Sequence, residues 1–250
     1  MKIAVITGAS SGLGIEFLRA AVTLCPEIDT YWLIARREDR LEALKPEKNL
    51  RPIALDLTDS AALKQFNALL EREKPEISLL INNAGFGKLC DFATSDIESQ
   101  TAMIDLNCRA LTAVTRYSLP YMKTGGLILN ISSIASFAPT PRMAVYCSTK
   151  AYVQSFSRAL REELKPKKIN VLAVCPGPMI TEFWQVADRP THKSRTLDML
   201  PHQSPAKMAT CALKAGLKGK SACTMGGFYK FYRFLAHILP KSLLMKWTKC

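Results

Sequence analysis

Short apolar runs alternate with longer amphipathic stretches along this chain. The apolar runs have the length of buried strands, and the stretches between them place apolar residues at helical spacing. We predict strands at Lys2–Thr7, Thr30–Ala35, Arg51–Leu55, Ile77–Ile81, Gly126–Ile131 and Ile169–Cys175. The predicted helices are Leu13–Leu24, Glu38–Lys45, Ser60–Lys74, Ile97–Leu119 and Met143–Leu164. Strands that alternate with helices indicate right-handed crossovers, and therefore an α/β fold with a parallel sheet covered by helices on both faces.

Two segments depart from this alternation. Residues 176–205 are rich in Pro and Thr and are too long for a simple connection. They follow the sixth strand, at the edge where open α/β sheets bind ligands, so we interpret them as a substrate-binding loop region. Residues 228–250 form a basic amphipathic extension. No repeat or long linker divides the chain, and we expect one domain over residues 1–250.

The composition narrows the class of protein. A hydrophobic fraction of 48% and a charged fraction of 22% are typical of a soluble globular protein. The eight cysteines form no Cys-x-x-Cys motif or zinc-like cluster, so we expect no metal site and a reducing compartment. The apolar run at the N-terminus ends at Gly8, too early for a signal peptide, and the uncharged window from Thr124 to Pro141 is broken by Gly and Pro. We therefore expect a cytoplasmic protein.

The net charge of +13 lies mainly near the C-terminus. Nine Lys and Arg residues and no acidic residue occur from Met199 to Cys250. Such an imbalance concerns surface association rather than fold. No nucleic-acid-reading module is visible, so we expect no nucleic-acid partner.

A glycine-rich segment, Thr7-Gly8-Ala9-Ser10-Ser11-Gly12-Leu13-Gly14, joins the first predicted strand to the first predicted helix. Glycines allow close backbone approach to a pyrophosphate, and the helix N-terminus offers free N–H groups and a positive dipole end. The Ser10 and Ser11 hydroxyls add further donors. An ordinary Gly-rich turn is the alternative, but the strand before and the helix after favour phosphate binding.

The ends of the next three strands carry further candidate residues. Arg36 and Arg37 stand where an acidic residue would accept a hydrogen bond from the ribose of NAD, and their guanidinium groups favour the 2′-phosphate of NADP. A solvated charge cluster is the alternative. Asp56 and Leu57 could contact adenine, although Asp56 could equally cap the following helix. Asn82-Asn83-Ala84-Gly85 predicts a turn that borders the cofactor.

Tyr146 and Lys150 are four residues apart on a predicted helix and so share one face. A nearby positive charge favours the phenolate, and we expect Lys150 to lower the pKa of Tyr146 so that it exchanges protons. The spacing alone also fits a half-buried Tyr beside a solvated Lys. The catalytic interpretation of the pair is favoured by two other motifs. They are the glycine-rich segment and the Ser132-Ser133 pair, which follows the fifth predicted strand.

Taken together, these motifs resemble the short-chain dehydrogenase/reductase family, in its common branch with a Thr-Gly-x-x-x-Gly-x-Gly segment and a Tyr-x-x-x-Lys pair. The resemblance covers about Met1 to Thr181. It implies a Rossmann-like doubly wound parallel sheet of six to seven strands in the order 3-2-1-4-5-6-7. It also implies direct hydride transfer, without a metal, between a nicotinamide and a carbinol carbon.

The resemblance further implies residue roles. Tyr146 would act as general acid or base, Lys150 would lower its pKa and hold the nicotinamide ribose, Ser133 would bind the substrate oxygen, and Asn107 would hold a relay water. The cofactor would contact Gly8, Ser10, Ser11, Gly12, Leu13, Gly14, Arg36, Arg37, Asp56, Leu57, Asn83, Ala84, Gly85, Tyr146, Lys150, Pro176, Gly177 and Thr181.

The C-terminus departs from the family pattern, in which a short seventh strand and a Gly-Gly turn close a tetramer. Ser221–Met225 is a poor strand, so we expect a homodimer, with the tetramer as the alternative. Apolar residues then recur at helical spacing from Phe228 to Leu239, and Pro240 ends the helix. Packing on the body, the wall of an apolar pocket, a dimer interface and contact with an anionic membrane surface are all open. We rank packing on the body or lining of the pocket first, and weak contact with the membrane second.

We expect an NADPH-linked reductase of a lipophilic ketone, or a dehydrogenase of the matching secondary alcohol. The lipophilic substrate is suggested by apolar residues in and near the loop region: Phe137, Met143, Met179, Ile180, Phe183 and Trp184. A reductase of 3-ketoacyl thioesters is an alternative. A non-catalytic NADP-binding or membrane-associated scaffold is a third interpretation, which the intact Ser133, Tyr146 and Lys150 oppose.

Overall fold

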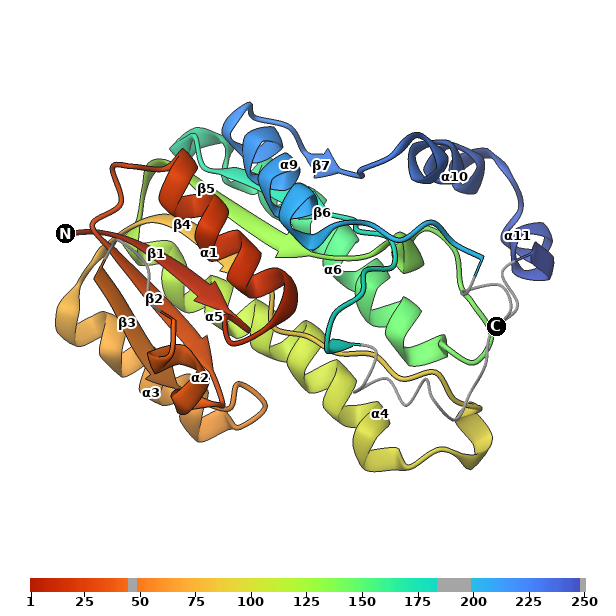
Figure 1. Ribbon diagram of the computed structural model, residues 1–250, viewed down its shortest axis with the longest axis horizontal. Helices are drawn as coiled ribbons and strands as arrows, with labels where there is room; N and C mark the ends of the chain where they lie inside the picture. Colours follow the sequence, from red (N-terminus) through yellow and green to blue (C-terminus); the bar gives the residue numbers. More distant parts are fainter. Residues whose placement is uncertain (45–48, 184–198, 248–250) are drawn as a thin grey trace.

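Seven parallel strands form one sheet in the order β3-β2-β1-β4-β5-β6-β7 (Figure 1). The structure is a computed structural model that describes residues 1–44, 49–183 and 199–247. The strands span Lys2–Thr7 (β1), Thr30–Ala35 (β2), Asn49–Ala54 (β3), Glu76–Asn82 (β4), Met122–Ile131 (β5), Asn170–Val174 (β6) and Ala222–Cys223 (β7). The predicted fold class and strand order are confirmed, and β1, β2, β4, β5 and β6 are largely buried.

Helices cover both faces of the sheet. They span Gly12–Leu24 (α1), Glu38–Glu42 (α2), Ser60–Glu73 (α3), Ile97–Ile104 (α4), Leu111–Ser118 (α5), Ala144–Glu163 (α6), Pro205–Leu217 (α9), Gly227–Ile238 (α10) and Lys241–Trp247 (α11). Short 3₁₀ turns lie at Phe92–Thr94, Leu119–Tyr121, Ile134–Ser136 and Lys165–Lys167, and a π-helical segment spans Asp105–Ala110.

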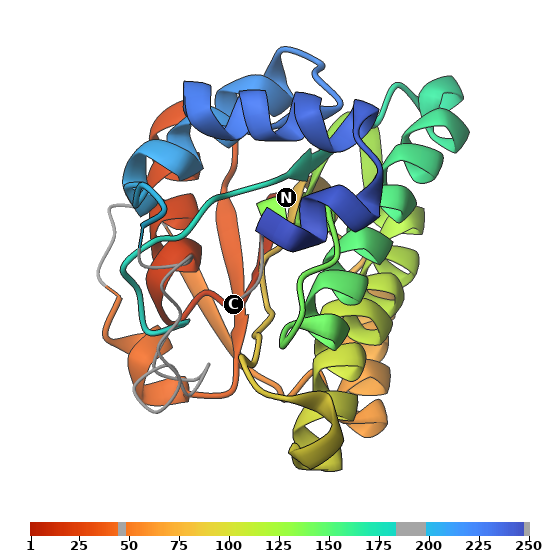
Figure 2. The ribbon, with the colours of Figure 1, turned by 90° about the vertical axis from the view of Figure 1, so that its right-hand side faces the viewer.

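Two apolar cores lie on opposite sides of the sheet. One packs α1 and α9 on the sheet through side chains such as Phe17 and Leu213, and the other packs α3, α5 and α6 through Phe66, Val114 and Leu160. Figure 2 shows these two helix layers on either side of the strands. The layers leave the carboxyl ends of the strands, and the loops that follow them, free to form a site.

Four local features differ from the sequence-based prediction. The predicted helix Ile97–Leu119 is interrupted by the π-helical segment, which contains Asn107. Strand β5 begins at Met122 rather than Gly126, because Met122 pairs with Ile77 before the register shifts at a bulge. The predicted Glu38–Lys45 helix is shorter, ending at Glu42. Helices α9 and α11 were not predicted.

The poor seventh strand is a two-residue strand. Ala222 and Cys223 pair with Ala173 and Val174 of β6. Gly226 then adopts a positive φ of 86° and serves as the N-cap of α10, so the Gly-Gly pair starts a helix here. Within the described residues no helix has the length and hydropathy required to cross a bilayer.

Candidate active site

The loops after β1 to β6 enclose a cavity of about 1160 Å³ at the carboxyl edge of the sheet. The strand order reverses between β1 and β4, and ligands of open α/β sheets bind at such a point. The cavity is lined by predicted residues from every one of these loops: Gly8, Ser10, Ser11, Gly12, Leu13, Arg36, Arg37, Asp56, Leu57, Asn83, Ala84, Gly85, Ser133, Tyr146, Lys150, Pro176, Gly177 and Thr181. Of the predicted residues, Gly14 and Asn107 lie behind this lining.

The glycine-rich segment makes a tight turn into α1. Gly8 has a φ of 66°, and a Cβ atom there would lie 2.8 Å from Ala84 Cα, so only glycine fits. Gly14 packs against the Gly8 carbonyl, where a Cβ atom would come within 2.2 Å, and so sets the spacing between helix and strand. Ser11 is the N-cap of α1, and its side chain makes no capping hydrogen bond among the described residues. Ser10, Ser11 and Gly12 line the cavity at the start of α1, where the N–H groups of a first helical turn can bind an anion.

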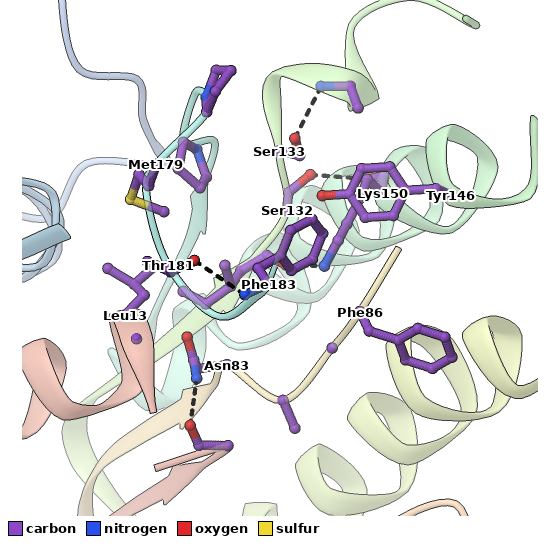
Figure 3. Close-up of a pocket in the computed structure, with 18 of the residues that line it drawn as sticks. Leu13, Asn83, Phe86, Ser132, Ser133, Tyr146, Lys150, Met179, Thr181 and Phe183 are labelled. Carbon is purple, nitrogen blue, oxygen red and sulfur yellow. Dashed lines mark hydrogen bonds between the residues drawn. The ribbon is translucent and has the colours of Figure 1, made fainter. Parts of the chain in front are cut away.

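Asn83 ties the β4 loop to the glycine-rich turn. Its side-chain amide donates to the Thr7 and Gly8 carbonyls at 3.1 and 3.0 Å, and the Thr7 hydroxyl accepts from the N–H groups of Asn83 and Ala84 at 3.0 Å each. The loop therefore holds the turn in place, as Figure 3 shows for Asn83.

Arg37 lies at the cavity wall and is paired with an acidic residue that the sequence analysis did not single out. Its guanidinium donates to Glu182 Oε2 at 3.2 Å and to the Ser10 hydroxyl at 3.4 Å. Arg40 of α2 donates to both Glu182 carboxylate oxygens at 2.6 and 2.8 Å. These two cations hold the pKa of Glu182 below its usual value, Arg40 most strongly. The negatively charged Glu182 carboxylate therefore lies near Ser10, at a place where an anionic group of a ligand could bind to Arg37.

Arg36 and Asp56 form the adjoining part of the wall. The Arg36 guanidinium lies 3.9 Å from Asp56 Oδ2, and both side chains are well exposed. Asp56 Oδ1 accepts from the N–H and hydroxyl of Thr58, at 2.9 and 2.7 Å. Asp59, rather than Asp56, caps α3 by accepting from the Ala61 N–H at 2.9 Å. Asp56 is therefore a wall residue and not the helix cap that the sequence left as an alternative.

Tyr146, Lys150 and Ser133 converge on the cavity (Figure 3). Tyr146 and Lys150 come from the first two turns of α6, and Ser133 follows β5. The Ser133 hydroxyl accepts from the Ala135 N–H at 3.1 Å and lies close enough to the Tyr146 hydroxyl to lower its pKa. Lys150 Nζ donates to the Ile131 carbonyl at 2.9 Å and lies 5.7 Å from the centre of the Tyr146 ring. The amine is buried beside the ring and does not point into solvent.

That Lys150 lowers the pKa of Tyr146 stays a prediction, and the shift seen in this structure has another cause. Burial raises the pKa of Tyr146 to about 12, and the neighbouring Ser133 side chain exerts the largest opposing effect. Burial also lowers the pKa of Lys150 to about 8. The reason is that an apolar environment disfavours both the phenolate form of Tyr146 and the ammonium form of Lys150.

Asn107 lies behind the catalytic candidates. Its amide oxygen accepts from the Phe86 N–H at 3.1 Å, and its amide nitrogen donates to the Phe86 carbonyl at 2.9 Å and to the Thr149 hydroxyl at 3.0 Å. The side chain thus joins the β4 loop to α6 and is almost fully buried. The π-helical segment presents Asn107 to the loop, as such segments commonly do at functional sites.

Comparison with known proteins identifies the family. Residues 2–191 match the family model for short chain dehydrogenases. The chain belongs to this family. The predicted family resemblance is thereby confirmed, and the chain is an NAD(P)-dependent oxidoreductase of the short-chain dehydrogenase type.

The similarity extends to curated and solved short-chain dehydrogenases. The chain is 36% identical over 193 residues, 73% of each chain, to an NADP-dependent 3-hydroxy acid dehydrogenase of Schizosaccharomyces pombe. A short-chain dehydrogenase of Sphingobium yanoikuyae in complex with NADPH superimposes with a TM-score of 0.80 and 28% identity, covering 98% of this chain and 96% of that one. A bulky-bulky ketone specific alcohol dehydrogenase of Comamonas testosteroni gives a TM-score of 0.72 and 28% identity, with coverage of 98% and 94%.

The far end of the cavity in this short-chain dehydrogenase is apolar. Of the apolar residues that the sequence suggested, Met143, Met179 and Phe183 line it, and the Phe183 ring lies 5.8 Å from that of Tyr146. Ile180 is exposed instead, Phe137 is buried against Tyr232, and Trp184 lies outside the described residues. Helices α10 and α11 complete the wall with Phe228, Tyr229, Phe231, Tyr232, Leu235 and Leu244.

Tyr229 fastens α10 to the body. Its ring packs against Gly177, where a Cβ atom would come within 2.6 Å of the ring, and its hydroxyl donates to the Pro201 carbonyl at 2.6 Å. The inner face of α10 thus packs on the body and lines the cavity, which is the interpretation that the sequence analysis ranked first. The sequence analysis missed Tyr229 itself and Glu182, because their partners are distant in the chain and leave no local pattern.

Proposed function

We propose that the protein reduces lipophilic ketones with NADPH, and oxidises the corresponding secondary alcohols with NADP⁺. One observation carries this proposal. Ser133, Tyr146 and Lys150 lie in a single cavity whose one end is a glycine-rich turn flanked by arginines and whose other end is apolar.

The residues at the polar end suit a dinucleotide. The turn between β1 and α1 is too crowded for a Cβ atom at Gly8 and offers N–H groups at the start of a 13-residue helix. Arg36 and Arg37 would hold a 2′-phosphate, and the β4 loop from Asn83 to Gly85 would flank the adenosine ribose. Thr181 lies against Gly12, so it would close over the middle of the cofactor.

The chemistry divides between cofactor and protein. When bound, NADPH supplies the hydride to the carbonyl carbon. The Tyr146 hydroxyl, which burial keeps protonated, donates its proton to the carbonyl oxygen as negative charge develops there. Ser133 donates a hydrogen bond to the same oxygen, and the ammonium of Lys150 stabilises the phenolate that remains. Asn107 positions α6 and the β4 loop and makes no contact with the cavity.

The preference for NADPH is supported from two sides. Two arginines follow β2, where a carboxylate would favour NAD. The similar proteins from S. pombe and S. yanoikuyae are described with NADP and NADPH respectively.

The apolar end supports a lipophilic substrate. Aromatic and aliphatic side chains from the loop after β6 and from α10 surround the space beyond Tyr146. The similar C. testosteroni enzyme is specific for bulky-bulky ketones. A panel of ketones graded by size and apolarity, followed by the loss of NADPH absorbance, tests the proposal.

Tyr146→Phe provides the decisive variant. Loss of the proton donor should lower kcat for ketone reduction by at least about 10²-fold and leave the Kd for NADPH unchanged. Tyr152→Phe is a matched control, since Tyr152 lies on the same helix and its hydroxyl contacts Thr112, 2.8 Å away, rather than the cavity. Turnover that survives in Tyr146→Phe would remove Tyr146 as the acid. NADPH binding with no oxidation on any ketone would favour the scaffold interpretation.

A second candidate is reduction of a 3-ketoacyl thioester. It is favoured by the run from Met199 to Cys250, which has nine basic and no acidic residues and could bind an acidic carrier. The S. pombe relative acts on a 3-hydroxy acid, which is the matching oxygen position. Including a 3-ketoacyl thioester and the corresponding free ketone in the panel distinguishes the two candidates.

A further inference from the structure

Helix α10 has an outer apolar face as well as the inner face that packs on the body. Tyr229 and Ala236 are buried on the inner face. The outer face carries large apolar side chains at intervals of three or four residues, which places them on one side of the helix. They are Phe228, Phe231, Phe234 and Ile238, exposed by 54%, 59%, 59% and 60%.

Helix α11 continues this surface. Lys241 Nζ donates to the Phe137 and Ala236 carbonyls at 2.6 and 2.7 Å and so fixes α11 against the end of α10. Leu243 of α11 is also exposed. Figure 1 shows α10 beyond β7 and α11 next to the end of α10. We call the exposed residues Phe228, Phe231, Phe234, Ile238 and Leu243 the outer apolar patch.

The patch lies in a strongly basic setting. Lys230 on α10 and Lys246 on α11 are exposed beside it. The sequence contains no Asp or Glu from Met199 to the C-terminus. An apolar face on two helices that carry basic and no acidic residues is complementary to anionic lipid headgroups and the acyl boundary beneath them. A symmetric contact with a second copy would instead bring like charges together.

The patch also borders the cavity. Phe228 and Phe231 both line the cavity and are more than half exposed, so they stand at its mouth. Phe234 and Ile238 are equally exposed but do not line it. Phe234 and Ile238 can therefore be altered without changing the wall of the cavity.

We propose that α10 and α11 bind the surface of an anionic lipid bilayer through the outer apolar patch, so that the mouth of the cavity opens toward the bilayer. A lipophilic substrate then enters from the lipid phase. Entry of the substrate from the lipid phase rests on the proposed function, whereas binding of α10 and α11 to the bilayer does not.

Vesicle flotation tests the surface without any turnover. Wild-type protein should float with vesicles of phosphatidylcholine and phosphatidylglycerol, and bind vesicles of phosphatidylcholine alone much more weakly. The Phe234→Ser/Ile238→Ser variant should bind the mixed vesicles at least about tenfold more weakly, because two large apolar side chains no longer insert. The double variant Phe92→Ser/Ile97→Ser is the matched control, since these residues are exposed by 60% and 59% on another part of the molecule, and it should bind normally.

Three results would overturn the proposal. One is no binding of the wild type to mixed vesicles, and the second is equal binding by wild type and Phe234→Ser/Ile238→Ser. The third is a drop in the oligomeric state of that variant in sedimentation, which would make the patch an interface between copies of the chain. Folding of each variant is checked by NADPH affinity, which should not change. In vesicles, the variant should lose turnover of a lipid-partitioned ketone and keep that of a water-soluble one. Vesicle binding without any turnover would contradict the proposed function and leave the binding surface intact.

Discussion

At the scale of single residues, burial acts on Tyr146 and Lys150 in opposite directions. It raises the pKa of the Tyr146 hydroxyl to about 12 and lowers that of the Lys150 amine to about 8. In an environment of low polarity the charged form of each group is disfavoured. At neutral pH Tyr146 therefore keeps its proton and Lys150 keeps its charge, which are the forms that ketone reduction requires.

A pH profile follows from these two values. We expect kcat/KM for reduction to be level near neutral pH and to fall as the pH rises through about 8, because Lys150 then loses the charge that stabilises the Tyr146 phenolate. Lys150→Arg, which keeps a cation at all accessible pH values, should move this fall to higher pH in any activity that remains. A wild-type profile that is level well above pH 8 would contradict the assignment.

The contribution of Lys150 to folding stability changes with pH in the opposite direction to kcat/KM. Its pKa in the folded protein lies below the 10.5 of an exposed lysine, so the unfolded chain binds more protons between about pH 8 and 10.5. Folding stability from this group therefore rises with pH through that window and is lowest below it. The site thus keeps a charge that disfavours folding at the pH at which it would act.

At the scale of elements, Glu182 links the loop after β6 to the end of β2 and to α2. Its carboxylate holds both Arg37 and Arg40, which are more than 140 residues away in the chain. The Glu182 carboxylate therefore lies beside the Arg37 guanidinium, which we expect to bind the 2′-phosphate of NADPH. This phosphate must compete with the carboxylate for Arg37. Because Thr181 lies against Gly12, the same loop joins the arginines to the middle of the site.

Two variants with opposite expected effects test this arrangement. Glu182→Gln should tighten NADPH binding a few-fold, because Arg37 no longer has a competing carboxylate. Arg37→Gln should weaken NADPH binding by about 10–100-fold, since charge-assisted hydrogen bonds to the phosphate are lost. The Kd for NADH should change little in both, and titration of each cofactor measures this.

Glu42→Gln serves as the control for Glu182→Gln. It removes an acidic residue from α2 next to the same arginines, and we expect no change in either cofactor affinity. Equal losses of NADPH and NADH affinity in Arg37→Gln would refute the 2′-phosphate role.

At the scale of the whole molecule, the cavity is closed by segments from both ends of the chain. The N-terminal strands and loops form its polar end, while α10 and α11 close its apolar end. Tyr229 makes the connection through its packing on Gly177 and its hydrogen bond to Pro201. The homodimer expected from the sequence stays a prediction.

Tyr229→Ala tests how far α10 shapes the substrate site. Removing the buried ring should lower the free energy of unfolding by about 3–5 kcal/mol and raise KM for large ketones far more than for small ones. The Kd for NADPH should change less than KM, since the glycine-rich turn and the arginines that we expect to hold its phosphates follow β1 and β2 and are not part of α10. Thermal unfolding and steady-state kinetics measure these effects, with Phe234→Ala, on the exposed side of the same helix, as control. An unchanged KM for large ketones would exclude α10 from the substrate wall.

The sequence by itself determined the sheet and the polar end of the site. Buried parallel strands appear as continuous apolar runs, and the glycine-rich turn, Arg36-Arg37 and the Tyr-Lys pair are local patterns that need only a few neighbouring residues. Once the strands are parallel, their carboxyl ends must meet, so the gathering of these motifs in one cavity was predictable.

Tertiary structure alone decided the electrostatics and the apolar end. The pKa values of Tyr146 and Lys150 depend on how deeply α6 is buried, which spacing along a helix does not reveal. The contacts of Glu182 with Arg37 and of Tyr229 with Gly177 join residues far apart in the sequence. Likewise, the apolar pattern of α10 is the same whether a side chain is buried or exposed. Only packing on the body separates the inner face, with Tyr229, from the outer apolar patch.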